Sequence, residues 1–225
     1  MDFNQFLELV KARRSIRRLK PDPIPAEYIE KVIDAARWAP SGANTQPWEF
    51  IVVRNRNIRH KLLDHVSERI DVSGLRDTPV LIVVCGDTRT RLLYPSGRYL
   101  GEIDKIMSGK DHVKLNENVL TSSLANAFLY ILLAAKTLGL GARYISATTN
   151  PTIQGEIKKL LKIPGYLVIY DTVALGYPED EPLQKTLRPL NEILHYEEFD
   201  ASKSPTNYEI VIKANELRKR LERRR

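Results

Sequence analysis

Ten residues, Ala39-Pro40-Ser41-Gly42-Ala43-Asn44-Thr45-Gln46-Pro47-Trp48, form the most distinctive stretch of this sequence. They separate a segment with a helical hydrophobic pattern from a segment with a strand pattern. The two prolines fix the backbone φ angle near each end and remove two backbone donors. Gly42 allows the chain to turn or to approach another group closely. The side chains between the prolines include hydroxyl and amide groups but no ionisable group, so the stretch predicts a stiff, neutral polar loop.

Two interpretations of this loop are open. Its polar side chains offer both donors and acceptors, as a planar neutral ligand with alternating N–H and C=O groups requires. These side chains belong to Ser41, Asn44, Thr45 and Gln46. The pyrimidine edge of a flavin is such a ligand. The alternative is a plain connector between a helix and a strand, built from turn-forming residues.

Hydrophobic residues recur at helical spacing on both sides of the loop. The predicted helices cover 2–12, about 26–38, about 56–70, 119–138, a segment opened by Asn150-Pro151, and a terminal segment from about 208. Apolar side chains nearly encircle the helix at 119–138, so we expect it to be buried on most sides. In a domain of this size, burial all round indicates a partner subunit.

Four short apolar runs predict strands, at 49–54, 79–85, 143–147 and 167–175. Successive prolines make 20–25 an extended linker. Residues 86–116 show no long periodic pattern, and a stretch of this length inside a domain is often functional. It is either a lid over a pocket or a disordered insertion, and both interpretations are open.

Length and composition bound the class of protein. The 225 residues and 43% hydrophobic content predict one globular domain over 1–200 and a basic helical extension over 201–225. No uninterrupted apolar run reaches the roughly 18 residues of a membrane span, so we expect no membrane partner. The single cysteine, Cys85, and the absence of an apolar leader favour a reducing cytoplasm.

The formal net charge of +7 is concentrated at 13–20 and 213–225. A nucleic-acid-binding module would need these clusters on one face with stacking aromatic residues between them. The sequence shows no such interleaving, and a solvated tail explains the second cluster. We therefore keep a basic nucleic-acid-binding module only as the alternative of another class.

Arg13-Arg14-Ser15-Ile16-Arg17 places three guanidinium groups and a hydroxyl just after the first helix. Guanidinium groups match phosphate oxygens in a bidentate manner. Lys185 and Arg188 form a second cationic pair in a proline-bounded loop. For both sets the alternative is a solvated basic surface.

Metal and dinucleotide motifs do not account for the sequence. The four histidines lack metal-ligand spacing with cysteine or acidic residues, so we expect no metal site. Gly139-Leu140-Gly141 lacks the third glycine of a dinucleotide fingerprint and follows a helix instead of a strand. We therefore expect no Rossmann site.

Several motifs, taken in order, resemble the nitroreductase family of flavoenzymes. They are 13–17, 39–48, Leu138-Gly139-Leu140-Gly141, and Leu175-Gly176-Tyr177-Pro178 followed by Arg188-Pro189-Leu190. The resemblance runs from about residue 5 to 195. It implies an α+β fold with a central, mostly antiparallel sheet flanked by helices. It also implies an intertwined homodimer with one FMN at each subunit interface.

The resemblance implies which residues contact FMN. From one subunit the expected phosphate and ring contacts are Arg13, Arg14, Ser15 and Arg17, with Arg188 and Lys185 as late cationic contacts. From the other subunit they are Pro40, Ser41, Gly42, Asn44 and Gln46. Ser146 and Ala147 fall where many members carry a glycine-containing pair whose backbone amide faces flavin N5, and neither is glycine here.

The activity that the resemblance implies is hydride transfer from NADH or NADPH through FMN to a nitro compound, quinone or similar small acceptor. Reductive dehalogenation or flavin fragmentation is the alternative within the same fold. Because the flavin supplies the chemistry, we assign no acid–base residue. Without a Rossmann site, the nicotinamide must bind over the flavin and leave before the acceptor enters, so we expect ping-pong kinetics.

Overall fold

A computed structural model describes the chain except for residues 88, 90–116, 183–184 and 223–225. The segment at 86–116 that was expected to be a lid or an insertion therefore lies almost entirely outside the described residues. The chain divides into two compact units, Met1–Pro182 and Leu183–Arg225, and each is described by itself.

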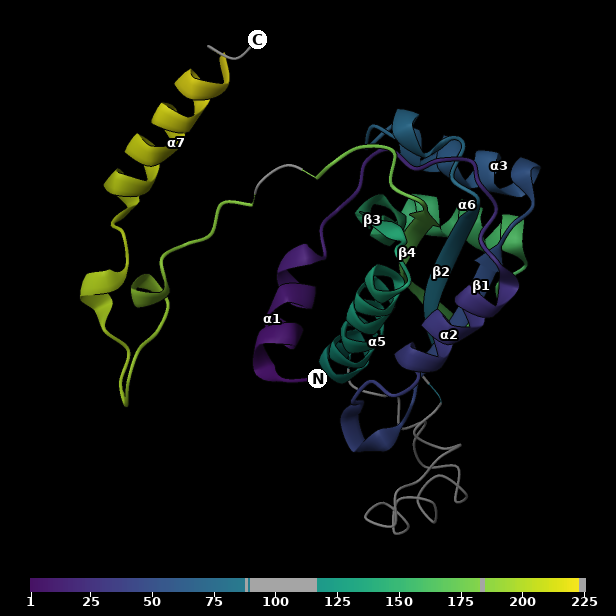
Figure 1. Cartoon of the computed structure of the whole chain (residues 1–225), viewed down its shortest axis with the longest axis horizontal. Coiled ribbons are helices and arrows are strands. Elements are labelled where there is room, and N and C mark those ends of the chain that lie inside the picture. The colour runs from purple at the N-terminus through teal and green to yellow at the C-terminus, as the bar shows by residue number, and fades with distance from the viewer. Residues whose placement is uncertain (88, 90–116, 183–184, 223–225) are drawn as a thin grey trace. The chain divides into compact units, whose positions relative to one another are not determined.

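A four-stranded sheet forms the centre of the first unit (Figure 1). The strands are β1 (Trp48–Val53), β2 (Val80–Asp87), β3 (Gly141–Ile145) and β4 (Leu167–Gly176), in the order β1-β2-β4-β3. Every neighbouring pair is antiparallel. The α+β class and the antiparallel sheet expected from the sequence are confirmed for this chain.

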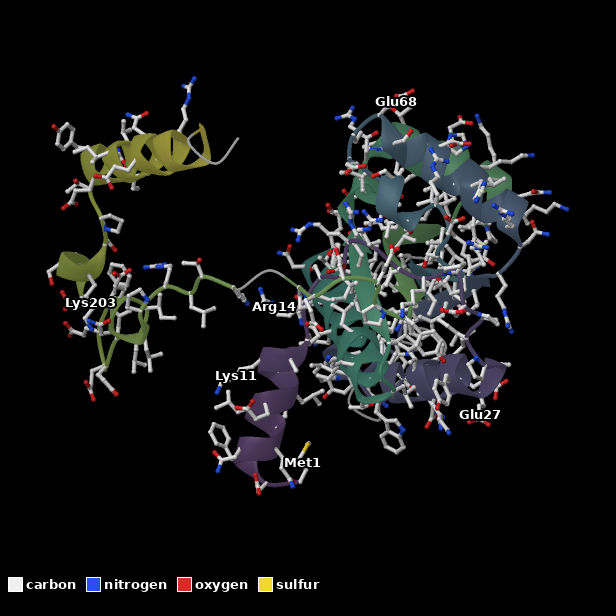
Figure 2. All side chains as sticks on the ribbon, turned by 45° about the horizontal axis from the view of Figure 1, so that its top comes forward. Met1, Lys11, Arg14, Glu27, Glu68 and Lys203 are labelled. Atoms are coloured by element: carbon white, nitrogen blue, oxygen red, sulfur yellow. The ribbon has the colours of Figure 1, made fainter. Side chains whose placement is uncertain are left out.

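Helices cover both faces of the sheet because successive residues of the central strand β2 point to opposite sides. Val80, Ile82 and Val84 pack with α2 (Ala26–Ala36) and α5 (Glu117–Thr137). Leu81, Val83 and Cys85 pack with α3 (Arg56–Ser67) and α6 (Pro151–Leu161). In Figure 2 Glu27 on α2 and Glu68 beside α3 mark these opposite sides. The result is a three-layer helix–sheet–helix unit.

Local sequence signals set the helix ends. Asp2 and Gln5 form a capping box at the start of α1 (Phe3–Ala12). The Asn150 side chain accepts hydrogen bonds from the backbone N–H groups of Thr152 and Ile153 at the start of α6, as the Asn-Pro pair predicted. The helix expected at about 26–38 ends at Ala36.

The strand expected at 143–147 needs correction. β3 ends at Ile145, and Ser146–Thr149 form a short 3-10 helix. The chain leaves the sheet there because the Thr148 hydroxyl lies within hydrogen-bond distance of the Ile145 carbonyl and of a carboxylate on β4.

The long helix α5 is buried on one broad side only. Leu120, Leu124, Phe128 and Ile131 pack into the core, whereas Leu129 and Tyr130 are 46% and 36% exposed. The expected burial on most sides is therefore not met by one chain alone. By length and composition alone, α5 is also apolar enough to cross a membrane, with a mean hydropathy of 1.5 over 18 residues, and one side of it packs on the sheet.

The second unit contains two short 3-10 turns, Leu190–Glu192 and Ala201–Lys203, and the predicted terminal helix α7 (Asn207–Glu222). Thr206 and Glu209 cap that helix reciprocally. The unit begins before the expected boundary at 200. Several large apolar side chains of this unit are exposed, among them Leu190, Ile193 and Phe199.

Candidate functional site

The loop at 39–48 holds an unusual backbone conformation. Three of its non-glycine residues have left-handed φ angles, Ala43 at 54°, Asn44 at 56° and Gln46 at 45°. Each such residue costs on the order of 1–3 kcal/mol and persists only where surrounding contacts impose it. A plain connector between a helix and a strand does not require three strained residues within the four positions 43–46. This geometry therefore favours the interpretation of the loop as a binding site.

Contacts with α5 impose the loop conformation. The Gly42 N–H donates to Ser123 Oγ at 3.2 Å, and Asn126 Nδ2 donates to the Pro40 carbonyl at 3.0 Å. The Gln46 N–H donates to Ser41 Oγ at 3.0 Å and closes the loop on itself. A β-carbon on Gly42 would lie 2.2 Å from Val119 Cγ1, so only glycine allows this approach.

Between the loop and α5 lies an open groove of about 370 Å³. Its lining comes from Pro40, Ser41 and Gly42 on the loop and from Asn118, Val119, Ser122, Ser123 and Asn126 on α5. The exposed side chain of Asn44 and the exposed ring of Pro40 stay available to a ligand, and the buried Thr45 Oγ1 lacks a hydrogen-bond partner in the described part of the chain. Sequence reasoning missed the α5 residues, whose only signal is a run of small polar residues inside an apolar helix.

The arginine segment runs along the edge of β3. Ser15 forms a parallel bridge with Ala142, and the Ile16 N–H donates to the Ala142 carbonyl at 3.0 Å. Burial of Ile16 and Leu19 fixes the segment, so the charged residues between them face outward. Figure 2 shows Arg14 just beyond Lys11, where the segment leaves α1.

The charged side chains of this segment differ in their partners. Arg18 Nε donates to Glu179 Oε2 at 3.2 Å. Across the described ranges, neither Arg13 nor Arg17 has a side-chain hydrogen bond or an ion pair. Arg143 on β3 donates to the Asp71 carbonyl at 2.7 Å, and burial, assisted by the nearby Arg17 charge, lowers its pKa. Within the described structure Arg13 and Arg17 therefore form no ion pair, although acidic residues line the same cavities.

The predicted phosphate residues do not share one cavity in a single chain. Arg13 and Arg14 line a cavity of about 350 Å³ together with Leu132 and Lys136 of α5. Arg17 lines another of about 710 Å³ with Arg143. Lys185 and Arg188 belong to the second unit, where Arg188 Nη2 donates to the Glu192 carbonyl at 3.3 Å.

The two halves of the predicted site lie at different places along α5. The loop at 39–48 contacts Ser123 and Asn126, whereas the Arg13 cavity is lined by Leu132 and Lys136. At 1.5 Å per residue, Ser123 and Lys136 are separated by roughly 20 Å along the helix axis. One chain therefore does not bring the loop and the arginine cavity together.

The turn Ser146–Thr149 follows directly from β3, the strand that the arginine segment borders. Ser146 is exposed, Ala147 is half-buried and Thr148 is buried. Thr148 Oγ1 donates to Asp171 Oδ1 at 2.6 Å, and Asp171 is completely buried on β4. Burial raises the pKa of Asp171 to about 6. Sequence reasoning missed Asp171, although an aspartate inside an apolar strand was a visible signal.

Comparisons with known proteins point to one family. The model of the family described as "Nitroreductase family" matches residues 10–78. The "Putative NADH dehydrogenase/NAD(P)H nitroreductase" of Methanothermobacter thermautotrophicus is 33% identical over 177 residues, which cover 78% of this chain and 78% of that protein. The iodotyrosine deiodinase of Danio rerio is 39% identical over 220 residues, covering 84% of this chain and 66% of that protein.

The fold of this chain is also similar to that of a solved structure. It is described as a "putative nitroreductase in complex with fmn" from Desulfovibrio desulfuricans. It superposes with a TM-score of 0.67 at 25% identity, over 88% of this chain and 100% of that one. The resemblance inferred from the motifs is thereby confirmed, and the chain belongs to the nitroreductase family.

Proposed function

We propose that this protein is an FMN-dependent oxidoreductase that takes reducing equivalents from NADH or NADPH and passes them to a small organic acceptor. The observation that carries the proposal is the strained loop at 39–48, which is locked onto α5 and presents neutral polar groups. The relative whose solved structure contains FMN supports the choice of cofactor. The relative named as a nitroreductase supports the choice of nicotinamide donor.

The residues present fit FMN. Arg13 and Arg17 form no ion pair in the described structure and line different cavities, so each is a candidate to hold the phosphate group through a charge-assisted hydrogen bond. Asn44 and the other accessible polar groups of the loop would meet the neutral ring edge. When bound, FMN supplies the hydride chemistry, while the chain positions the reactants and excludes water.

A homodimer is part of the same proposal. The loop and the arginine cavity are separated along α5, so the loop of one subunit and the arginines of the other would have to meet across an interface. The exposed Leu129 and Tyr130 of α5 supply apolar surface for such a contact. The predicted contacts from Ser146, Ala147, Lys185 and Arg188 remain predictions within this scheme.

Reductive dehalogenation is the second candidate for the acceptor reaction. The 39% identity with an iodotyrosine deiodinase favours it, because this similarity covers most of the present chain. A halogenated phenol and a nitroaromatic compound would compete for the same reduced flavin.

The absorption spectrum of the purified protein is the first test, since bound flavin gives a yellow protein. Anaerobic addition of NADH or NADPH should bleach the flavin, and addition of a nitroaromatic compound or a halogenated phenol should restore the colour. The acceptor that restores it faster distinguishes the two candidate reactions. A colourless protein that also fails to bind added FMN would overturn the proposal.

A further inference from the structure

Asp171 is a carboxylate inside the hydrophobic core. It lies on β4 with no exposed surface, and its strand neighbours Ile169 and Val173 are buried apolar residues. An ionised carboxylate without a counter-charge is costly in such a place. No cationic side chain contributes to the pKa of this acid, which is governed by burial and by hydrogen bonds alone. Packing by itself therefore gives no reason for an aspartate here.

The hydrogen bonds of Asp171 are concentrated on one oxygen. Oδ1 accepts from Thr148 Oγ1 at 2.6 Å and from its neighbour's backbone, the Thr172 N–H, at 2.8 Å. Oδ2 has no hydrogen bond of good geometry within the described chain. The Tyr144 hydroxyl of β3 lies close enough to lower the pKa of the acid, and it donates to the Tyr170 hydroxyl at 3.2 Å.

Thr148 connects this buried acid to the turn Ser146–Thr149. Its single hydroxyl hydrogen has two acceptors within reach, Asp171 Oδ1 at 2.6 Å and the Ile145 carbonyl at 3.1 Å. The bond to an ionised carboxylate is the stronger of the two. Loss of the charge on Asp171 therefore weakens the contact that ties the turn to β4 and leaves the hydroxyl with the competing Ile145 carbonyl.

We propose that Asp171 is a positioning residue, which acts through Thr148 to set the orientation of the Ser146–Thr149 turn toward the flavin and releases that turn when it becomes protonated. The part of this statement that concerns the flavin rests on the proposed function. The link between Asp171 and the turn is a property of the chain itself, so the two can be tested separately.

The environment of Asp171 places its titration in the physiological range. Burial raises its pKa to about 6, against the opposing effect of the hydrogen bonds from Thr148, Thr172 and Tyr144. The polar groups that face it are Thr148 from the turn, Tyr144 from β3 and the Thr172 N–H from β4. The Phe128 ring of α5 packs against the Tyr144 ring, with the two ring centroids 4.4 Å apart. Burial raises the pKa of the Tyr144 hydroxyl well above its ordinary value, so the titration near pH 6 belongs to the carboxyl group.

The direct test follows the turn by NMR in the protein without added cofactor. In the unmodified chain, the backbone amide resonances of 146–149 should shift with pH, with a midpoint near 6 that matches the carboxyl resonance of Asp171. Asp171→Asn keeps an acceptor oxygen for Thr148 but has no ionisable group, so its turn should not titrate. Thr148→Val removes the link, so the carboxyl resonance should titrate while the turn does not follow it.

Two further variants control this experiment. Thr148→Ser restores the hydroxyl and should restore the titration of the turn. Thr149→Val removes another hydroxyl of the same turn, one that donates to the Ser146 carbonyl, and should leave the titration in place. If the turn still titrates in Thr148→Val, or stays fixed in the unmodified chain while Asp171 titrates, the inference is wrong.

Stability provides a second readout that needs no cofactor. The folded-state pKa of about 6 lies above the ordinary value of 3.8, so the folded chain binds the extra proton between these values. The unmodified protein should therefore gain stability relative to Asp171→Asn as the pH falls from 8 to 4. The ratio of their unfolding constants should change on the order of 100-fold. A ratio of unfolding constants that is independent of pH would contradict the raised pKa of Asp171 in the folded protein.

The effect of the turn on the flavin is tested in protein to which FMN has been added. The absorption maximum of bound FMN should shift around pH 6 in the unmodified protein and Thr149→Val but not in Thr148→Val. The midpoint potential falls with pH in every variant because reduction takes up protons, but a further change near pH 6 should appear only in the unmodified protein and Thr149→Val. If FMN does not bind at all, the proposed function fails and the NMR result still stands. If FMN binds and its spectrum and potential ignore the titration of the turn, the positioning role fails while the cofactor assignment stands.

Discussion

Gly74 lies directly against the backbone of Arg17, and a β-carbon on Gly74 would sit 2.3 Å from the Arg17 carbonyl oxygen. The Leu19 N–H donates to the Gly74 carbonyl at 3.3 Å, so the short helix Ser73–Leu75 supports the arginine segment in addition to β3. The position of Arg17 is therefore set by two distant parts of the chain.

Gly74→Ala should destabilise the protein by about 1–3 kcal/mol, because a backbone carbonyl cannot move aside as a flexible side chain does. Thermal unfolding measures this loss. Gly165→Ala is the matched control, since a β-carbon there meets nothing within 4 Å. Equal melting temperatures for the two variants would contradict the close approach of Gly74 and Arg17.

Replacing Arg13 or Arg17 with alanine should weaken FMN binding. A charge-assisted hydrogen bond contributes about 1.5–3 kcal/mol, which corresponds to roughly 10- to 150-fold in the dissociation constant. Titration of apoprotein with FMN, followed by flavin fluorescence, gives the constants. Arg18→Ala is the control, because Arg18 is already paired with Glu179 on the surface. Unchanged affinity in both test variants would remove the phosphate role from this segment.

A site shared between subunits predicts complementation. Arg17→Glu damages the arginine half of the site, and Asn44→Asp damages the loop half. After subunit exchange, some heterodimers should combine the intact halves and recover one FMN site, although each parent binds FMN weakly. Light scattering that finds a flavin-loaded monomer would contradict the shared site.

Steady-state kinetics should follow a ping-pong pattern, because nicotinamide and acceptor would use the same face of the flavin in turn. Double-reciprocal plots at several acceptor concentrations should give parallel lines. Shortening the segment 86–116 should change the acceptor constants and leave flavin reduction nearly unchanged in stopped-flow measurements. Intersecting lines would require a second binding site.

Cys85 should resist thiol reagents in the folded protein. Its side chain is fully buried on β2, and burial raises the pKa of the thiol to about 12. Since the thiolate is the reactive form, labelling at pH 8 should be slow in buffer and fast in denaturant. Rapid stoichiometric labelling of the folded protein would show that β2 opens readily.

The sequence alone determined the features that depend on neighbouring residues. The run at 79–85 predicted a buried strand, because only a strand covered on both faces is apolar without interruption, and β2 is buried throughout. Asn150-Pro151 predicted the start of α6 through capping and the fixed φ of proline. The prolines and Gly42 predicted a rigid loop, although not the left-handed φ angles of Ala43, Asn44 and Gln46, which contacts with α5 impose.

The tertiary structure alone decided which distant residues meet. Pairing of β3 with β4 sets Ile145 opposite Thr172, and this register brings the Ser146–Thr149 turn beside Asp171. No local pattern encodes that register, so the predicted strand ran two residues too far and the role of Asp171 was missed. Likewise, Arg13 and Arg17 look like one cluster in the sequence, yet the segment runs extended along β3 with buried Ile16 between them, so their side chains line different cavities. The spacing of residues close together in the sequence determines local backbone conformation. Contacts between distant residues depend instead on how the sheet and the helices that cover it pack.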